Sequence, residues 1–178
     1  MIRIHKATEA DLDALREVGC ETYREHFSTI WTRAGLENFL DQDFSLTALR
    51  QSLAAPERHL WLIVSDRSAQ VVGFAKVNWA TVVPVTGGTG AELQKIYFRQ
   101  SAAGLGYGRQ LLRFICEQAA QRGEQRVWLD VLKSNTKAHA FYEGFGFQRL
   151  GEIPFSTDLL EIGMRVMGFE LNKHQMGK

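Results

Sequence analysis

The chain has 178 residues, of which 45% are hydrophobic and 23% are charged, a composition typical of one globular domain that buries a core. Its formal net charge is +1 and it has no run of Lys or Arg, which argues against a nucleic-acid partner. No stretch approaches 18 uninterrupted apolar residues and residues 1–6 lack the apolar core of a signal peptide, so we expect a cytoplasmic protein without a membrane partner.

The N-terminal region is predicted to form one strand followed by helices. Residues 2–6 alternate like a strand, and the capping box at Thr8–Asp11 predicts a helix from about Glu9. The aromatic-rich segment that follows is interrupted by Gly35, which favours short helices joined by a loop. Leucines at helical spacing over residues 46–53 predict another helix, which ends before the next proline.

The next region is predicted to form a pair of strands, a loop and a central strand. His59–Val64 and Val71–Trp79 are strand-like, and the polar connection between them predicts antiparallel pairing. Residues 81–90 are rich in Pro, Gly and Thr, so they are predicted to form a mobile loop. The central strand is predicted at Leu93–Phe98.

A glycine-rich turn follows the central strand. Gly104, Gly106 and Gly108 lie within five positions, and apolar residues then recur at helical spacing, which predicts a strand, a glycine loop and a helix. Glycines lack the Cβ atoms that keep a ligand away from the backbone, and a helix N-terminus presents unpaired N–H groups. We therefore expect an anionic group, a phosphate above all, to bind there. The alternative is a turn that only caps the helix.

Two nucleotide-binding fingerprints fail at this loop. A Rossmann loop needs a glycine five positions after Gly104, where this chain has Arg109. A Walker loop needs Lys and then Ser or Thr after its last glycine, whereas Gly108 is followed by Arg109 and Gln110. The expected phosphate therefore belongs to another class of ligand.

The C-terminal part is predicted to form three strands and one helix. Val127–Leu132 is typical of a buried strand, and residues 135–147 are predicted to form a short helix that ends at a glycine. Two further strands are predicted at Phe145–Glu152 and Leu159–Met167.

Strands and helices interleave along the chain without internal repeats, which predicts a single mixed α/β sheet layered by helices. No linker divides the chain, so we expect one domain over residues 1–170 and a frayed tail over 171–178. Cys20 and Cys116 stand alone within helical patterns, which favours buried, reduced thiols over a disulfide or a metal site. The sequence leaves the oligomeric state open, and a homodimer is the commonest case.

Two segments resemble the GCN5-related N-acetyltransferase (GNAT) family. Residues 103–108 resemble the family's Gln/Arg-x-x-Gly-x-Gly/Ala sequence, which holds the pyrophosphate of acetyl-coenzyme A, although Ala103 departs from the usual Gln or Arg. Asn135, Ala138 and Tyr142, with Gly-Phe downstream, resemble the family's Asn-x-x-Ala-x-x-x-Tyr pattern. At about 100° per residue, Asn135 and Tyr142 fall within roughly 20° of each other on a helix, so both can address one ligand.

The resemblance covers nearly the whole chain and implies the GNAT fold, with acetyl-coenzyme A as cosubstrate and no metal. It also implies that the backbone of the central strand pairs with the amides of pantetheine, as an added strand would. The cofactor-binding residues that it implies are Ile96, Tyr97, Phe98, Gly104, Leu105, Gly106, Tyr107, Gly108, Arg109 and Asn135.

Acetyl transfer to an amine requires a base, because an aliphatic amine with a pKa of about 10.4 is protonated at neutral pH. Glu92, at the start of the central strand, is the candidate base, and the alternatives are a solvent-facing charge at this position or a water chain to another group. By resemblance, Tyr142 donates a proton to the departing thiolate. Tyr23, Phe27 and Trp31 lie where the family builds its acceptor wall, although core packing is the alternative.

Within the family, the nearest resemblance is to the bacterial spermidine/spermine (polyamine) acetyltransferase branch, through Lys76-Val-Asn, Leu93-x-x-Ile-Tyr and Trp128-Leu-x-Val. The implied function is acetyl transfer to a primary amine of a small molecule, with a polyamine as one candidate, by direct attack without an acyl-enzyme. Two alternatives stay open. One is an acetyltransferase for protein N-termini or lysines, and the other is a non-catalytic acyl-CoA-binding module.

Overall fold

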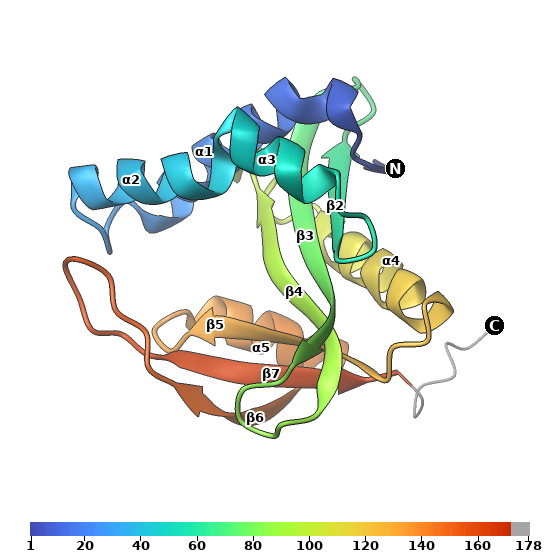
Figure 1. Ribbon diagram of the computed structural model, residues 1–178, viewed down its shortest axis with the longest axis vertical. Helices are drawn as coiled ribbons and strands as arrows, with labels where there is room; N and C mark the ends of the chain where they lie inside the picture. The colour runs from blue at the N-terminus through green and yellow to red at the C-terminus, as the bar shows by residue number, and fades with distance from the viewer. Residues whose placement is uncertain (172–178) are drawn as a thin grey trace.

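The computed structural model describes residues 1–171 and forms one twisted sheet with helices on both faces (Figure 1). Within this range the sheet has seven strands in the order β1-β2-β3-β4-β5-β7-β6, which confirms the predicted mixed α/β fold. The strands are β1 (Arg3–Lys6), β2 (His59–Ser65), β3 (Val71–Val82), β4 (Thr89–Phe98), β5 (Arg126–Leu132), β6 (Gln148–Ile153) and β7 (Met164–Glu170). The helices are η1 (Glu9–Asp11), α1 (Leu12–Phe27), α2 (Arg33–Phe44), α3 (Leu46–Leu53), η2 (Gln100–Ala102), α4 (Tyr107–Gln121) and α5 (Thr136–Phe145).

Two hydrophobic cores cover the two faces of the sheet. On one face, α1 buries Leu15 and Val18 at helical spacing in a core that also holds Phe44 of α2. On the other face, α4 buries Leu112 and Ile115 against β4 and β5. The central strands lie between the two cores, so successive residues of β4 face opposite sides of the molecule.

The neighbours of β4 differ in how far they pair with it. Antiparallel pairing with β3 extends along most of the strand, with one extra residue, Gln94, inserted as a bulge. Parallel pairing with β5 covers only Ala91 and Glu92, opposite Val127 and Trp128. Beyond Glu92 the two strands diverge, as Figure 1 shows. This divergence leaves one side of β4 without a backbone partner strand.

Two predictions in the helical region need correction. The helix α1 begins at Leu12 rather than Glu9, because the capping box at Thr8 starts the short helix η1 first. Gly35 does not interrupt a helix, since α2 runs from Arg33 to Phe44 through it. Gly35 lies in the first turn of α2, and a Cβ built there would lie 2.1 Å from the Asp158 carboxylate. The glycine permits a close contact rather than breaking the helix.

The predicted loop at residues 81–90 is confirmed only over its middle part, residues 83–88. Its ends extend β3 and β4, with Thr81 opposite Gly90 and Val82 opposite Thr89. The Thr81 hydroxyl donates to the Gly90 carbonyl at 2.9 Å, and a Cβ on Gly90 would lie 2.8 Å from the Arg126 carbonyl oxygen. The glycine that suggested a loop is therefore required by close strand packing.

The C-terminal strands are shifted from their predicted positions. The strands β6 and β7 begin at Gln148 and Met164, whereas the sequence pattern predicted starts at Phe145 and Leu159. Leu171, the first residue of the predicted frayed tail, is buried and its N–H donates to Gln125. The rest of that tail lies outside the described residues. Within residues 1–171, no helix has both the length and the apolar character needed to span a membrane.

Candidate active site

The glycine loop has a backbone that only glycine adopts without strain. Gly104 and Gly106 both have φ of +75°, in the left-handed region. A Cβ built on either residue would have no protein atom within 4 Å, so the space in front of the loop is open. Gly108 differs, because a Cβ there would contact the Phe141 ring at 3.4 Å. The first two glycines thus shape the loop, and the third allows α4 to pack against α5.

The same loop presents a continuous run of unpaired backbone donors. Within residues 1–171, none of the N–H groups from Gly104 to Arg109 donates to a protein acceptor. The flanking N–H groups are paired, since Ala103 donates to Gln100 and Gln110 donates to Gly106. These free donors lie at the N-terminus of α4, where the helix dipole is positive. The arrangement is suited to a phosphate group.

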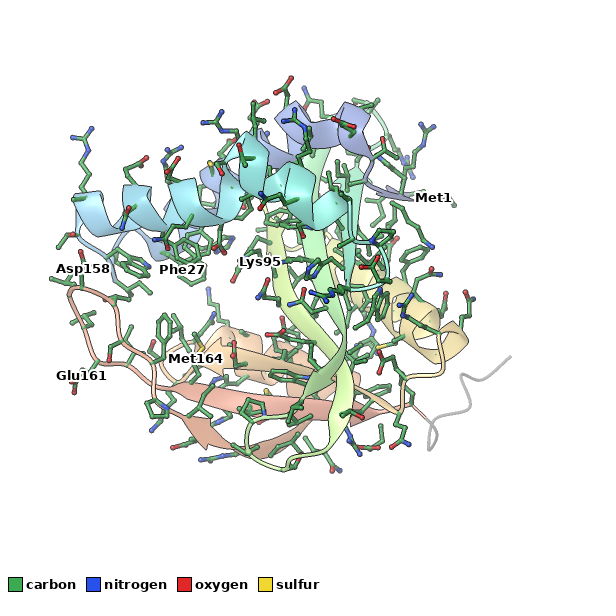
Figure 2. All side chains as sticks on the ribbon, viewed as in Figure 1. Met1, Phe27, Lys95, Asp158, Glu161 and Met164 are labelled. Carbon is green, nitrogen blue, oxygen red and sulfur yellow. The ribbon has the colours of Figure 1, made fainter. Side chains whose placement is uncertain are left out.

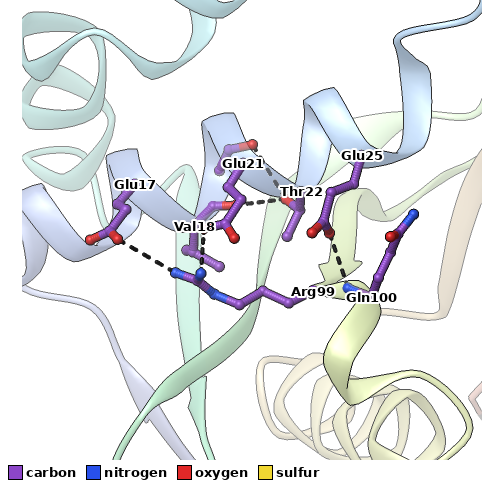
Figure 3. Close-up of polar contacts among 8 residues, drawn as sticks. Glu17, Val18, Glu21, Thr22, Glu25, Arg99 and Gln100 are labelled. Atoms are coloured by element: carbon purple, nitrogen blue, oxygen red, sulfur yellow. Dashed lines mark hydrogen bonds and ion pairs between the residues drawn. The ribbon is translucent and has the colours of Figure 1, made fainter.

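Helix α1 fixes the segment that leads into this loop, as Figure 3 shows. The Arg99 guanidinium pairs with Glu21 and lies 3.8 Å from Glu17. One turn further along α1, the Glu25 carboxylate accepts a hydrogen bond from the Gln100 N–H at 3.0 Å. Three carboxylates on one helix therefore hold the end of β4 and the start of the loop.

The free side of β4 presents the backbone groups of alternate residues. Arg99 donates its N–H to Val72 of β3 at 2.9 Å. In an antiparallel ladder, the backbone N–H and C=O groups of successive residues point to opposite sides of the strand. Tyr97, two residues before Arg99, therefore also bonds to β3. Ile96 and Phe98 direct their backbone groups to the other side, toward the gap left by β5. The Phe98 carbonyl accepts a hydrogen bond from the His26 ring at 3.1 Å.

Tyr142 lies in the core on the α4 side of the sheet, with its ring 5.5 Å from that of Phe147. Burial raises the pKa of its hydroxyl well above the ordinary value, so the group stays protonated at neutral pH. Within residues 1–171 this hydroxyl has no protein hydrogen-bond partner. Burial, and then the nearby hydroxyls of Tyr23 and Tyr142, raise the pKa of Tyr97.

Glu92 lies on the opposite face of the sheet, at the point where β4 and β5 part. It accepts a hydrogen bond from the Asn78 amide at 2.8 Å. Asp130 of β5 faces the same space, because burial and then the Glu92 charge raise the pKa of Asp130. Lys95 is buried and donates to Asp43 of α2 at 2.6 Å. This face therefore holds the carboxylates of Glu92, Asp130 and Asp43 together with Lys95 and Lys76, and Lys95 neutralises Asp43.

The aromatic residues of α1 and its following turn form the wall above these charges. The Tyr23 ring stacks on Phe39 at 4.5 Å, and Phe27 meets the edge of Tyr97 at 5.4 Å. The indole N–H of Trp31 is buried without a protein partner. In Figure 2, Phe27 and Lys95 lie on the side of α2, where Lys95 binds Asp43, and Met164 lies on the side of β7.

The open end of this space is bridged by the connection between β6 and β7. The Thr157 hydroxyl donates to the Ile30 carbonyl at 2.5 Å, and the Asp158 carboxylate accepts from the Thr32 N–H at 3.0 Å. The Thr32 hydroxyl bonds to the same carboxylate. The β6–β7 connection and the α1–α2 turn therefore form a bridge across the space, which we call the bridge (residues 28–32 and 154–163).

Two of the cofactor residues named from the sequence lie at helix ends. Asn135 is the N-cap of α5, and its side chain accepts from the Ala138 N–H at 3.1 Å, so it precedes the helix that carries Tyr142. Arg109 lies in the first turn of α4 with its guanidinium 5.5 Å from the Phe145 ring.

Sequence reasoning missed several residues around Glu92. Asp130 is a charged residue within the otherwise apolar run Val127–Leu132, and this contrast could have identified it as a candidate site residue. Lys95 likewise interrupts a strand pattern. The bridge had no local signal, because Thr157 and Asp158 find their partners more than 120 residues away.

Comparisons with known proteins agree with this geometry. Residues 13–147 match the acetyltransferase (GNAT) family. The chain is 26% identical over 159 residues to an uncharacterized N-acetyltransferase of Lactobacillus delbrueckii subsp. lactis, covering 86% of this chain and 88% of that protein. It is 32% identical over 111 residues to the 5-NmdU N-acetyltransferase of Pseudomonas phage PaMx11, covering 62% of this chain and 73% of that protein.

Solved structures share the fold at lower sequence identity. PaiA N-acetyltransferase from Thermoplasma acidophilum, in complex with coenzyme A, superposes with a TM-score of 0.78 at 20% identity, over 96% of this chain and 99% of that one. A mutant of spermidine N-acetyltransferase SpeG from Vibrio cholerae has a TM-score of 0.70 at 14% identity, over 98% of this chain and 96% of that one. The chain therefore belongs to the acetyltransferase (GNAT) family of N-acetyltransferases.

Proposed function

We propose that this chain transfers the acetyl group of acetyl-coenzyme A directly to a primary amine of a small molecule. The run of unpaired N–H groups from Gly104 to Arg109 carries the proposal, because these donors suit the pyrophosphate of the cosubstrate. The backbone groups of Ile96 and the N–H of Phe98 supply a second contact, to the amides of pantetheine. Ala103 lacks the side chain of the usual Gln or Arg, so backbone donors carry the phosphate contact here.

The cysteines do not support an acyl-enzyme route. Burial raises the pKa of the Cys116 thiol to about 12, so it is not a thiolate at neutral pH, and it lies in the core beneath α4. Burial also raises the pKa of Cys20 on α1. Direct attack by the amine on the thioester is therefore the simpler route.

Two protein groups supply the proton transfers of this reaction. Glu92 takes a proton from the acceptor ammonium, which frees the lone pair that attacks the thioester carbonyl. An unpaired N–H of β4 stabilises the oxyanion of the tetrahedral intermediate. As the C–S bond breaks, the neutral hydroxyl of Tyr142 protonates the departing thiolate, and the proton that the attacking nitrogen then loses restores the hydroxyl.

The charges near Glu92 favour a cationic acceptor. Asp130 adds a second carboxylate next to Glu92, whereas Lys95 is already paired with Asp43 and is therefore not available to neutralise these two carboxylates. The bridge leaves less room for a polypeptide than an open groove would, which favours a small molecule over a protein substrate. A polyamine fits both features and is our candidate acceptor.

We expect Gly106→Ala to weaken coenzyme A binding by about tenfold or more, because the methyl group of the alanine would occupy the space in which we expect the phosphate to bind. Gly123→Ala is a matched control, since Gly123 has a φ of +85° and open space at the other end of α4. Both changes carry similar backbone strain of about 1–2 kcal/mol. The affinities are measured by calorimetric titration of the folded variants with coenzyme A. Equal affinities for the two variants would contradict a phosphate site at this loop.

Tyr142→Phe keeps the ring and should leave coenzyme A affinity nearly unchanged while it removes the proton donor. We expect kcat to fall by about 10²–10⁴-fold, as is typical for general acid catalysis. Tyr97→Phe, which removes the neighbouring hydroxyl, should change kcat far less. Single-turnover rates avoid masking by product release. A wild-type single-turnover rate for Tyr142→Phe would assign the general acid to another group.

The acceptor is tested by acetyl-coenzyme A consumption across polyamines, aminoglycosides, amino acids and peptides. We expect the highest kcat/KM for a small amine with more than one positive charge, and Glu92→Gln should lower that rate. Peptides as the best substrates would favour the protein acetyltransferase, which is the second candidate function. Tight coenzyme A binding without transfer to any amine would favour a non-catalytic module.

A further inference from the structure

Three polar side chains form a row across adjacent strands on the acceptor face. His59 of β2 is in register with Asn78 of β3, and Asn78 is in register with Glu92 of β4. The His59 Nδ1 and Asn78 Oδ1 atoms are 2.7 Å apart, and Asn78 Nδ2 lies 2.8 Å from Glu92 Oε2. Asn78 is buried, with 8% of its surface exposed, so its amide depends on these two partners.

The direction of each hydrogen bond follows from the chemistry of Glu92. An ionised carboxylate only accepts hydrogen bonds, so Asn78 must turn its NH₂ group toward Glu92. The amide oxygen then faces His59, which must carry its proton on Nδ1. The row therefore runs in one direction, from the imidazole N–H through the amide to the carboxylate.

We propose that His59 and Asn78 are positioning residues that hold the Glu92 carboxylate in a fixed orientation for proton abstraction. This inference rests on the proposed function, in which Glu92 is the base. Asn78 reaches one carboxylate oxygen and leaves the other for the acceptor. The carboxylate fixes the amide orientation, because a flipped amide would set its oxygen against Glu92, and His59 supports that orientation by donating to the amide oxygen.

Other charged groups also act on Glu92. Lys76 of β3 and Asp130 of β5 both interact electrostatically with its carboxylate, and Lys95 on β4 interacts with these two groups. None of them contributes to the hydrogen bonds of the row, so variants of His59 and Asn78 leave these charges in place.

Kinetic measurements on Asn78→Leu and His59→Phe test the proposal. Both variants should lower kcat by about 10- to 100-fold, because a misplaced reacting group costs rate, with little change in the KM for acetyl-coenzyme A. His59→Gln retains an N–H donor and should recover most of the lost rate.

A matched control separates positioning from stability. Ser52→Ala removes the 2.8 Å hydrogen bond from the Trp61 indole on the same strand as His59, yet it does not touch the row. It should leave kcat unchanged. The proposal is overturned if folded His59→Phe and Asn78→Leu behave like Ser52→Ala.

The ring of His59 provides a readout that does not depend on activity. Nitrogen NMR of the resting protein should find the neutral ring protonated on Nδ1, and Asn78→Leu should remove that preference. A neutral ring protonated on Nε2 in the wild-type protein would contradict the proposed directions of the hydrogen bonds in the row. If Glu92→Gln kept full activity, the assignment of Glu92 as the base would be wrong, and the row would have no catalytic role. The NMR measurement on the His59 ring would still test whether the hydrogen bonds of the row exist.

Discussion

The divergence of β4 from β5 after two paired residues is the constraint on which the rest of the site depends. A strand that loses its neighbour exposes backbone donors and acceptors, and these need a partner of similar spacing. Here the gap opens between Glu92 and the glycine loop, so one ligand can contact the free strand side and the unpaired N–H groups from Gly104 to Arg109 together. The two cores on either face keep β4 in position without help from β5.

The two faces of the divergence carry different chemistry. On the α4 side lies Tyr142, buried and neutral, within an apolar core. On the α1 side lie Glu92 and Asp130. In the reaction that we propose, a thioester held in the gap would meet the proposed acid, Tyr142, on one face and the proposed base, Glu92, on the other. Helix α1 links the glycine loop with this side, because it holds the start of the loop through Glu25 and also carries Tyr23, whose ring stacks on Phe39.

Sequence patterns predicted the elements that rest on local rules. The strand, glycine loop and helix around Gly106 followed from apolar periodicity and from the conformational freedom of glycine. Errors arose where a glycine served a distant contact, as Gly35 does against Asp158 and Gly90 does against Arg126. The row from His59 to Glu92 was equally hidden, because strand register, rather than sequence spacing, brings its members together.

Amide hydrogen exchange, measured by NMR for individual residues with and without coenzyme A, tests the central claim most directly. If pantetheine pairs with the free side of β4, the Ile96 and Phe98 amides gain protection, whereas those of Lys95 and Tyr97, already paired with β3, change little. The amides of the glycine loop should slow at the same time. Protection confined to the loop, with Ile96 and Phe98 unchanged, would contradict the account that the divergence of β4 from β5 forms the cofactor site.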